Sequence, residues 1–284
     1  MVAQFDIRPS PIAGKWYPAN AQVLARQVDE YINAASINSP AADVVAVVAP
    51  HAGHIYSGPV AGYAFAALRG LKPDLVCIIS PMHHLYPQAL LTTAHQAYAT
   101  PLGQVLVDGA AQERLSERLK RTLGYGLSYI KHDPEHSLEI ELPFLQRVFT
   151  GGFHLLPVML RDQSPHVAQA LGQALGEVLA GANALLVAST DLSHFYTQEE
   201  ARLLDTVMLE RMAAFDPVGV LQAEQEGRGF ACGHGAVAAV LWAAKALGAD
   251  EVKVLHYATS GDVSGDYEQV VGYGAAVITR KRTG

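Results

Sequence analysis

The sequence is poor in cysteine and lacks the pattern of a disulfide-rich protein. Cys77 and Cys232 are the two cysteines among 284 residues. A disulfide framework needs several cysteines, and a cytosolic chain keeps its thiols reduced. We therefore expect a buried core, and not covalent cross-links, to hold the fold together.

Long hydrophobic segments are also missing. No uninterrupted apolar run reaches the roughly 18 residues of a membrane-spanning helix. The first residues, "MVAQFDIRPSPIAGKWYP", contain no apolar signal-peptide core. These two absences predict a cytoplasmic protein that is not embedded in a membrane.

Charge is scarce, and neither sign is concentrated in one place. Charged residues make up 17% of the chain, and the formal net charge is −7. Nucleic-acid-binding proteins usually carry a basic stripe, so we do not expect a nucleic acid as a partner. Hydrophobic residues make up 50% of the chain, which is enough for a large core. We expect a single domain over residues 1–284.

Short apolar runs alternate with longer amphipathic runs along the chain. The short runs are rich in Val, Ile and Leu and mostly lack polar alternation, which is typical of strands buried on both faces. The alternation predicts an α/β fold with a mostly parallel central sheet flanked by helices. No helix separates Ala89–Thr93 from Gln104–Val107, so this pair is expected to form a hairpin or an antiparallel edge. The predicted strands are Val44–Ala49, Leu75–Ser80, Ala89–Thr93, Gln104–Val107, His154–Leu160, Ala184–Ser189, Glu251–His256 and Val271–Ile278. The predicted helices are the run after Asn20, Pro59–Leu68, Ala111–Leu123, His136–Phe149, His166–Leu179, Thr197–Phe215, Pro217–Glu226 and His234–Leu247.

Histidines follow three of the predicted strands directly. In open α/β sheets, ligands bind beyond the carboxyl ends of the strands, where the loops are neighbours. One such histidine would most often be a solvated loop residue, but three at matching positions predict a shared site. The strand-end residues are His51 and His54 in "PHAGH", His83 and His84 in "PMHH", and Asp191 and His194 in "TDLSHF".

The stretch "GRGFACGHGAV" places Cys232 between glycines at the start of a predicted helix. A helix N-terminus favours a thiolate, and a thiolate binds a metal or acts as a nucleophile. Cys77 lies inside the run "LVCIIS" and is expected to be a small buried core residue.

Three kinds of chemistry fit these side chains. Two imidazoles and one anionic ligand form the facial arrangement of non-haem Fe(II), and the same set suits Zn²⁺ with one open position. Alternatively, Cys232 acts as a nucleophile activated by His194 or His51. Asp191 precedes His194 by three residues, a spacing that permits it to orient the imidazole as a general base.

Two further stretches have two interpretations each. "KHDPEHSLEIELPFL" is either a helix start with acids in its first turns or a further part of the site. It carries His132, His136, Glu139 and Glu141. "SPIAGKWYPAN" places Trp16 where an aromatic either anchors the terminus or binds substrate. No phosphate-binding fingerprint is present.

Five stretches in this order, "APHAGHIYSGPVAGYAF", "ISPMHH", "EHSLEIELPFLQ", "STDLSHF" and "CGHGAV", resemble the Memo family. Its bacterial and archaeal members are known as AmmeMemoRadiSam system protein B. The resemblance covers nearly the whole chain. It implies the fold of the LigB-type class III extradiol dioxygenases and a metal site formed by His51, His83 and Cys232. It also implies that His194 is the base and that Asp191 lines the pocket.

The resemblance further implies a non-haem iron oxidoreductase, similar to a dioxygenase, that acts on an aromatic or small polar substrate. Fe(II) is the expected cofactor, with Zn or Cu as alternatives. The rival functions are a non-catalytic signalling module that binds a peptide or protein, and a Zn-dependent hydrolase. A functional link to AMMECR-type and radical-SAM proteins is implied as well. The residues expected to contact substrate are His54, His84, His136 and Trp16.

Overall fold

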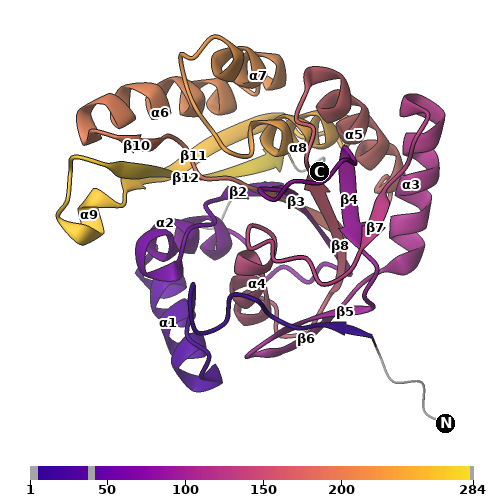
Figure 1. The fold of residues 1–284 in the computed structure, drawn as a ribbon, viewed down its shortest axis with the longest axis horizontal. Coiled ribbons are helices and arrows are strands. Elements are labelled where there is room, and N and C mark those ends of the chain that lie inside the picture. The colour runs from indigo at the N-terminus through magenta and orange to yellow at the C-terminus, as the bar shows by residue number, and fades with distance from the viewer. Residues whose placement is uncertain (1–5, 38–41, 282–284) are drawn as a thin grey trace.

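A nine-stranded mixed sheet lies at the centre of the computed structural model, which describes residues 6–37 and 42–281 (Figure 1). Its four middle strands run parallel to one another. In sheet order they are β2 (Asp43–Ala49), β9 (Ala184–Ser189), β3 (Leu75–Pro81) and β8 (His154–Leu160). The predicted α/β domain is confirmed, and its parallel part is the part that positions the predicted site.

Antiparallel strands flank this parallel centre. On one side β12 (Val270–Arg280) runs antiparallel to β2, and both β11 (Glu251–Thr259) and β10 (His194–Tyr196) pair antiparallel with β12. On the other side β4 (Leu90–Thr93) is antiparallel to β8 and parallel to β7 (Ser128–Ile130). The sheet as a whole is therefore mixed, and parallel pairing dominates at its centre.

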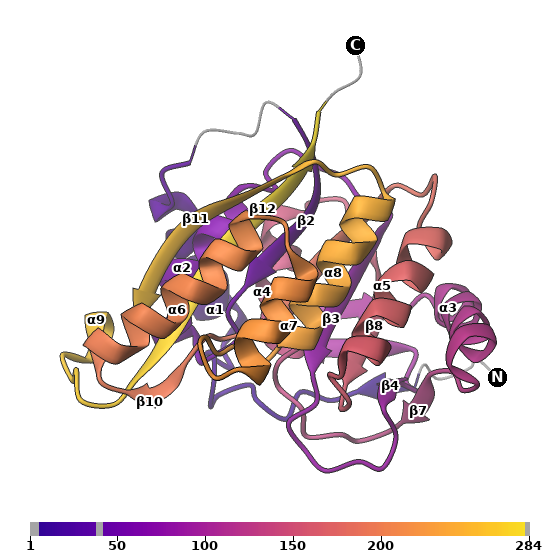
Figure 2. The ribbon, with the colours of Figure 1, turned by 90° about the horizontal axis from the view of Figure 1, so that it is seen from above.

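Helices cover both faces of the sheet, as Figures 1 and 2 show. Adjacent residues of β2 face opposite layers: Val48 packs into one core cluster and Val47 into the other. This burial on both faces explains why the central strands lack polar alternation. One layer contains α3 (Gly109–Leu123), α5 (Pro165–Val178), α6 (Gln198–Ala213), α7 (Pro217–Gln225) and α8 (His234–Ala246). The other contains α1 (Ala21–Ala34), α2 (His54–Ala66) and α4 (Leu142–Val148).

A small second sheet corrects one prediction. It consists of β1 (Ile7–Arg8), β5 (Ala97–Thr100) and β6 (Gly103–Leu106), and β5 and β6 form an antiparallel pair. The hairpin is therefore β5–β6. The predicted partner Ala89–Thr93 corresponds to β4, which pairs with β8 and β7 instead. Two turn residues, at positions 101 and 102, separate the hairpin strands, whereas β4 ends ten residues before β6 begins.

Two helices begin elsewhere than predicted. Helix α2 begins at His54 and contains Pro59 in its interior, although proline usually marks a first turn. The predicted helix His136–Phe149 begins only at Leu142, after a short 3₁₀ turn η1 (Glu139–Glu141). Before it, the Glu135 side chain accepts hydrogen bonds from nearby backbone amides, which replaces helical pairing.

A further short helix, α9 (Gly261–Ser264), precedes β12. Within the residues that the structure describes, no helix is long and apolar enough to cross a membrane.

Candidate metal centre

The carboxyl ends of β2, β3 and β9 meet at one edge of the sheet, as the sequence predicts. The residues that follow β2 and β3 bring two histidines together there, and the ring centroids of His51 and His83 are 5.3 Å apart. His194 follows β9 and is close enough for its charge to affect His51 and His83. His51 and His83 therefore lie side by side at this edge, and whether they form a shared site remains a prediction.

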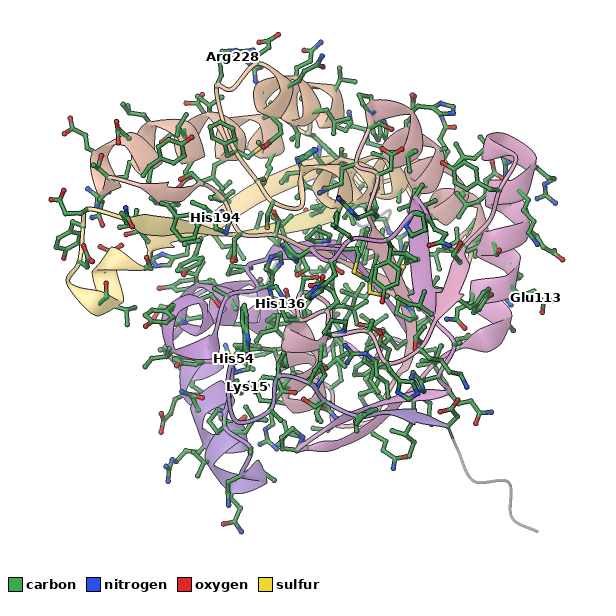
Figure 3. The ribbon with its side chains drawn as sticks, viewed as in Figure 1. Lys15, His54, Glu113, His136, His194 and Arg228 are labelled. Carbon is green, nitrogen blue, oxygen red and sulfur yellow. The ribbon has the colours of Figure 1, made fainter. Side chains whose placement is uncertain are left out.

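His136 joins His51 and His83 in a group of three histidines. One ring nitrogen from each of these residues lies within 4.8 Å of the other two. The ring of His136 stacks on His83 at 4.8 Å and meets His51 edge-on at 5.4 Å. His136 lies near the middle of the molecule in Figure 3. Three convergent imidazoles are a ligand set for a divalent transition metal.

Glu135 orients the rings of His83 and His136, a role that was not predicted from the sequence. Its Oε1 lies 2.9 Å from Nδ1 of His83 and 3.2 Å from Nδ1 of His136. Its carboxylate also accepts hydrogen bonds from the backbone amides of His83, His136 and Ser137. With Nδ1 bound to a carboxylate, Nε2 is the free nitrogen of each ring, which is the usual arrangement behind metal-binding histidines.

The charge of Glu135 is stabilised inside the protein. Burial raises the pKa of its carboxyl, but the hydrogen bonds from His136 and His83 outweigh burial and hold this pKa well below its usual range. Glu135 is 1% exposed, so a buried anion sits directly behind two candidate ligands. Such an anion offsets part of the positive charge of a metal ion.

His51 is oriented by a different partner. Its Nδ1 lies 2.9 Å from Ser189 Oγ, and its Nε2 lies 3.1 Å from Cys232 Sγ. Burial lowers the pKa of His51 well below 6.5, and the neighbouring His136 and His83 lower it further. His51 is therefore a neutral imidazole at neutral pH, as a metal ligand must be.

Cys232 lies beside His51 but outside the group of three histidines. Burial raises the pKa of its thiol, and the neighbouring Asp191 raises it further. This corrects the expectation that the helix start favours a thiolate, because desolvation outweighs the hydrogen bond from the Asp191 amide to Sγ. The protonated thiol lies within reach of two acceptors, His51 Nε2 at 3.1 Å and the Asp191 carbonyl oxygen at 3.6 Å. Metal coordination by Cys232 therefore requires loss of a proton.

Gly233 allows the loop of Cys232 to pack against the end of β9. A Cβ atom at this position would lie 2.5 Å from the backbone oxygen of Ser189 and 2.9 Å from Thr190 Cβ. The Gly233 amide donates to Thr190 Oγ1 at 2.9 Å. Gly233 thus allows a close approach of two backbones.

Asp191 positions the loop after β2 and does not contact His194 through a hydrogen bond. Its Oδ1 accepts hydrogen bonds from the amides of His51, at 2.7 Å, and Ala52, at 3.3 Å. Burial raises the pKa of Asp191 to about 7, although these amides lower it. This corrects the expected Asp191–His194 pair, since the backbone amides of the loop after β2 bind the Asp191 carboxylate instead.

His194 is oriented by the backbone. Its Nδ1–H donates to the Leu192 carbonyl oxygen at 2.8 Å, which leaves Nε2 with a free lone pair. Burial lowers the pKa of His194, and the nearby His83 lowers it further, whereas the bond to Leu192 raises it. A neutral imidazole in this tautomer is a competent proton acceptor.

The remaining predicted residues lie in three different environments. His54 is 1% exposed in the apolar core, where its ring packs on Tyr17 and Phe144 and its Nε2 bonds to the Ile140 oxygen. His84 is exposed next to His83 and is not part of the histidine group. Trp16 stacks on His136 at 4.0 Å between ring centroids.

The N-terminal segment secures the stretch that carries His136. Arg8 is buried and forms ion pairs with Asp133 and Glu139. Glu139 also accepts a hydrogen bond from Tyr17 at 2.6 Å. Glu139 therefore serves as a structural anchor, and His132 packs edge-on against His95, away from the three histidines.

A cavity of about 520 Å³ opens beside the histidine group. Three of its lining residues are direct neighbours of the histidines. Trp16 stacks on His136, and Ala52 and Phe195 follow His51 and His194 in the sequence. Phe195 has a φ of 64° and is 70% exposed, so it projects at the mouth of the cavity. The full lining is Lys15, Trp16, Ala52, Gly53, Ile55, Tyr56, Phe195, Ser260, Ser264, Asp266, Gln269, Val271 and Tyr273.

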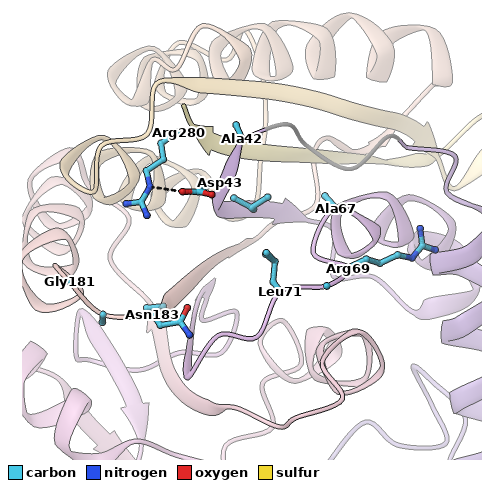
Figure 4. Close-up of a pocket in the computed structure, with 12 residues that line it drawn as sticks. Ala42, Asp43, Ala67, Arg69, Leu71, Gly181, Asn183 and Arg280 are labelled. Atoms are coloured by element: carbon cyan, nitrogen blue, oxygen red, sulfur yellow. Dashed lines mark ion pairs between the residues drawn. The ribbon is translucent and has the colours of Figure 1, made fainter. Parts of the chain in front are cut away.

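A larger cavity of about 650 Å³ lies at the opposite ends of the strands (Figure 4). Its charged side chains already have partners: Arg280 pairs with Asp43 at 3.6 Å, and Arg69 donates to Asn33 Oδ1 and the Ile32 oxygen. Because it is lined by the first residues of β2 and β9, it is separate from the candidate site, which lies beyond the carboxyl ends of these strands.

The family model and the sequence relatives agree on one family. The family model described as "Memo-like protein" matches residues 8–277. A MEMO1 family protein of Nitrosopumilus maritimus is 35% identical over 276 residues, which cover 95% of this chain and 98% of the relative. A MEMO1 family protein of Thermotoga neapolitana is 37% identical over 284 residues, which cover 96% of this chain and 100% of the relative. The crystal structure of an uncharacterized protein from Escherichia coli K12 aligns with a TM-score of 0.44 and 13% identity, over 83% of this chain and 100% of that chain.

Proposed function

Since this chain belongs to the Memo family, we propose that it is a metal-dependent oxidoreductase whose centre is formed by His51, His83 and His136. One observation carries the proposal. One nitrogen of each ring lies within 4.8 Å of those of the other two rings, and each ring has its Nδ1 bound by a buried partner, either Glu135 or Ser189. These contacts at Nδ1 leave Nε2 of each ring as the nitrogen available to a metal.

Iron is the metal we propose, in its ferrous form, with the thiol of Cys232 as a fourth donor beside His51. Ferrous iron at such a centre supplies redox chemistry with dioxygen. Cys232 remains a predicted ligand. Within the described residues, the group whose ligand atoms lie close enough together to share a metal ion consists of the three histidines.

The protein's own residues supply binding and proton transfer. A small, flat substrate fits the cavity between Trp16 and Tyr273, whose rings line its walls. His194 accepts a proton from the substrate at Nε2, because its Nδ1–H is held by Leu192. Asp191 keeps the backbone around His51 in place by accepting hydrogen bonds from the backbone amides of His51 and Ala52.

A zinc-dependent hydrolase is the second candidate, and the three imidazoles favour it. Three histidines with one open position are the ligand set of a zinc enzyme that activates water. His194 would then serve as the base toward that water. The two functions share every residue and differ in the metal that the protein retains.

Purification without oxygen, followed by metal analysis and oxygen-uptake assays with a catechol series, tests the proposal. We expect iron in the protein and substrate-dependent oxygen uptake that the His194→Ala variant loses while it keeps its metal. The His166→Ala variant, altered at an exposed position on α5, is the control and should keep full uptake. Zinc in the protein together with ester hydrolysis would replace the first candidate with the second.

A further inference from the structure

Ser189, at the end of β9, is surrounded by more hydrogen-bond partners than an ordinary serine. Its Oγ lies 2.6 Å from the Ser137 carbonyl oxygen, 2.7 Å from Glu141 Oε1 and 2.9 Å from His51 Nδ1. Ser137, Glu141 and Ser189 are each at most 1% exposed, so water does not compete for these contacts.

A count of protons decides what each partner must be. A serine hydroxyl donates one hydrogen bond and accepts two. The Ser137 carbonyl oxygen can only accept, so it takes the single proton of Ser189. The other two partners must then donate to Ser189 Oγ. His51 donates from Nδ1–H, and Glu141 donates from a protonated carboxyl group.

We propose that Glu141 is a neutral carboxylic acid that acts through Ser189 to fix His51 in its Nδ1–H tautomer. The role is that of a positioning residue, since Glu141 reaches His51 only through the serine hydroxyl. The Nε2 lone pair of His51 then points toward Cys232 and the other two histidines. The proposal deepens the metal centre proposed above and rests on it for one of its two readouts.

The surroundings of Glu141 favour the neutral form. Its Oε2 is buried and has no hydrogen-bond partner, which a neutral carbonyl oxygen tolerates far better than an ionised carboxylate. Within residues 6–37 and 42–281, no basic side chain forms an ion pair with it. Burial raises the pKa of Glu141 well above its usual value, and the nearby Asp191 carboxyl raises it further.

The other assignments leave a contact without a proton. If Glu141 were ionised and took the Ser189 proton, the Ser189 and Ser137 oxygens would face each other at 2.6 Å with no hydrogen between them. If Ser189 donated to His51 instead, the Ser137 carbonyl oxygen would be left without a donor, whether or not Glu141 carries a proton. The neutral acid is the assignment that satisfies all three contacts.

Spectroscopy of the metal-free protein tests the protonation directly. Infrared difference spectra between wild type and Glu141→Gln at neutral pH should show the carbonyl stretch of one protonated carboxylic acid. Nitrogen-15 spectra should show His51 as the Nδ1–H tautomer. The absence of the carboxylic acid signal would overturn the proposal, whatever the protein's metal.

Zn²⁺ affinity gives the second readout. We expect Glu141→Gln to bind Zn²⁺ within about threefold of wild type, because its amide N–H still donates to Ser189. Glu141→Leu should bind about tenfold more weakly or worse, since loss of an outer partner costs about 10–100-fold. Equal losses in both variants, with unchanged melting temperatures, would show that a carboxylate charge is needed and would overturn the proposal.

The matched control is the same pair of changes at Glu113, which is exposed on α3 (Figure 3). Glu113→Gln and Glu113→Leu should leave Zn²⁺ affinity unchanged. If wild type binds no Zn²⁺ or Fe²⁺, the metal centre fails while the infrared signal still decides the state of Glu141. The two proposals therefore fail separately. Should Glu141→Leu not fold, wild type and Glu141→Gln supply both readouts.

Discussion

At the scale of single residues, two of the three candidate ligands, His51 and His83, can be predicted from the sequence, but the groups that orient them cannot. His51 and His83 follow apolar strands directly, and that position marks them. Glu135 binds two histidines that are 53 residues apart in sequence, and nothing in "DPEHS" indicates such a partner. In sequence it is indistinguishable from an acid in the first turn of a helix.

Glu135→Gln tests the role of this buried carboxylate. An amide in its place cannot accept hydrogen bonds from both histidines at one oxygen with the same strength, and the charge is lost. We expect Zn²⁺ affinity to fall by about 10–100-fold, measured by calorimetric titration. Unchanged affinity, alongside an equally unchanged Glu113→Gln control, would refute this role.

Cys232 is expected to release its proton when a metal binds. Because burial raises the pKa of its thiol, the metal-free protein holds a thiol at pH 7. Calorimetric Zn²⁺ titrations in buffers of different ionisation enthalpy should show about one proton fewer released by Cys232→Ala than by wild type. The Cys77→Ala variant, which removes a thiol from β3, should release as many protons as wild type. Equal release by all three proteins would exclude Cys232 as a thiolate ligand.

His54 makes the stability of the fold sensitive to acid. Burial lowers its pKa from 6.5 to about 4, even though the bond to the Ile140 oxygen raises it. Below pH 6.5, His54 binds a proton in the unfolded chain but stays neutral in the folded chain. The contribution of neutral His54 to the free energy of unfolding is therefore complete above pH 6.5 and is lost as the pH falls toward 4. The difference amounts to roughly 3 kcal/mol.

His54→Phe should flatten the pH dependence of the free energy of unfolding between pH 6.5 and 4, measured by urea denaturation. Phenylalanine suits the apolar site between Tyr17 and Phe144. His166→Phe at an exposed position is the control and should keep the wild-type slope. An unchanged slope in His54→Phe would mean that other groups cause the acid sensitivity.

At the scale of elements, regular strands and helices were predictable because their apolar periodicity is local. The four central strands and helices such as α5, α6 and α8 lie close to their predicted bounds. The stretch before α4 was predicted as helix, because its apolar spacing continues into α4. Its side chains instead satisfy the backbone, and Arg8 from a distant segment binds it. Such pairing is non-local and leaves no periodic signal.

Gly233 tests whether the Cys232 loop must lie close to β9. A Cβ atom in Gly233→Ala would lie 2.5 Å from the Ser189 backbone oxygen, so the loop has to shift. We expect a loss of about 1–3 kcal/mol in the free energy of unfolding, together with weaker Zn²⁺ binding. Gly109→Ala, at a position with no atom within 4 Å of the added Cβ, should lose neither. Equal stability of the two variants would contradict the close-packing argument.

At the scale of the whole molecule, the centre draws on segments from most of the chain. Trp16, His51, His83, His136 and Cys232 come from five separate stretches, and the sheet edge brings them together. The sequence predicted this edge because parallel strands end on the same side. It could not predict that His136 joins the group, since that depends on how the N-terminal segment anchors residues 133–139.

Metal content of the protein purified without oxygen and without an affinity tag tests the central claim most directly. We predict about one metal ion per chain in wild type and a near-complete loss in both His83→Ala and His136→Ala. His84→Ala, which removes the exposed neighbour of His83, should retain the full amount. Full metal content in His136→Ala would contradict the centre of three histidines.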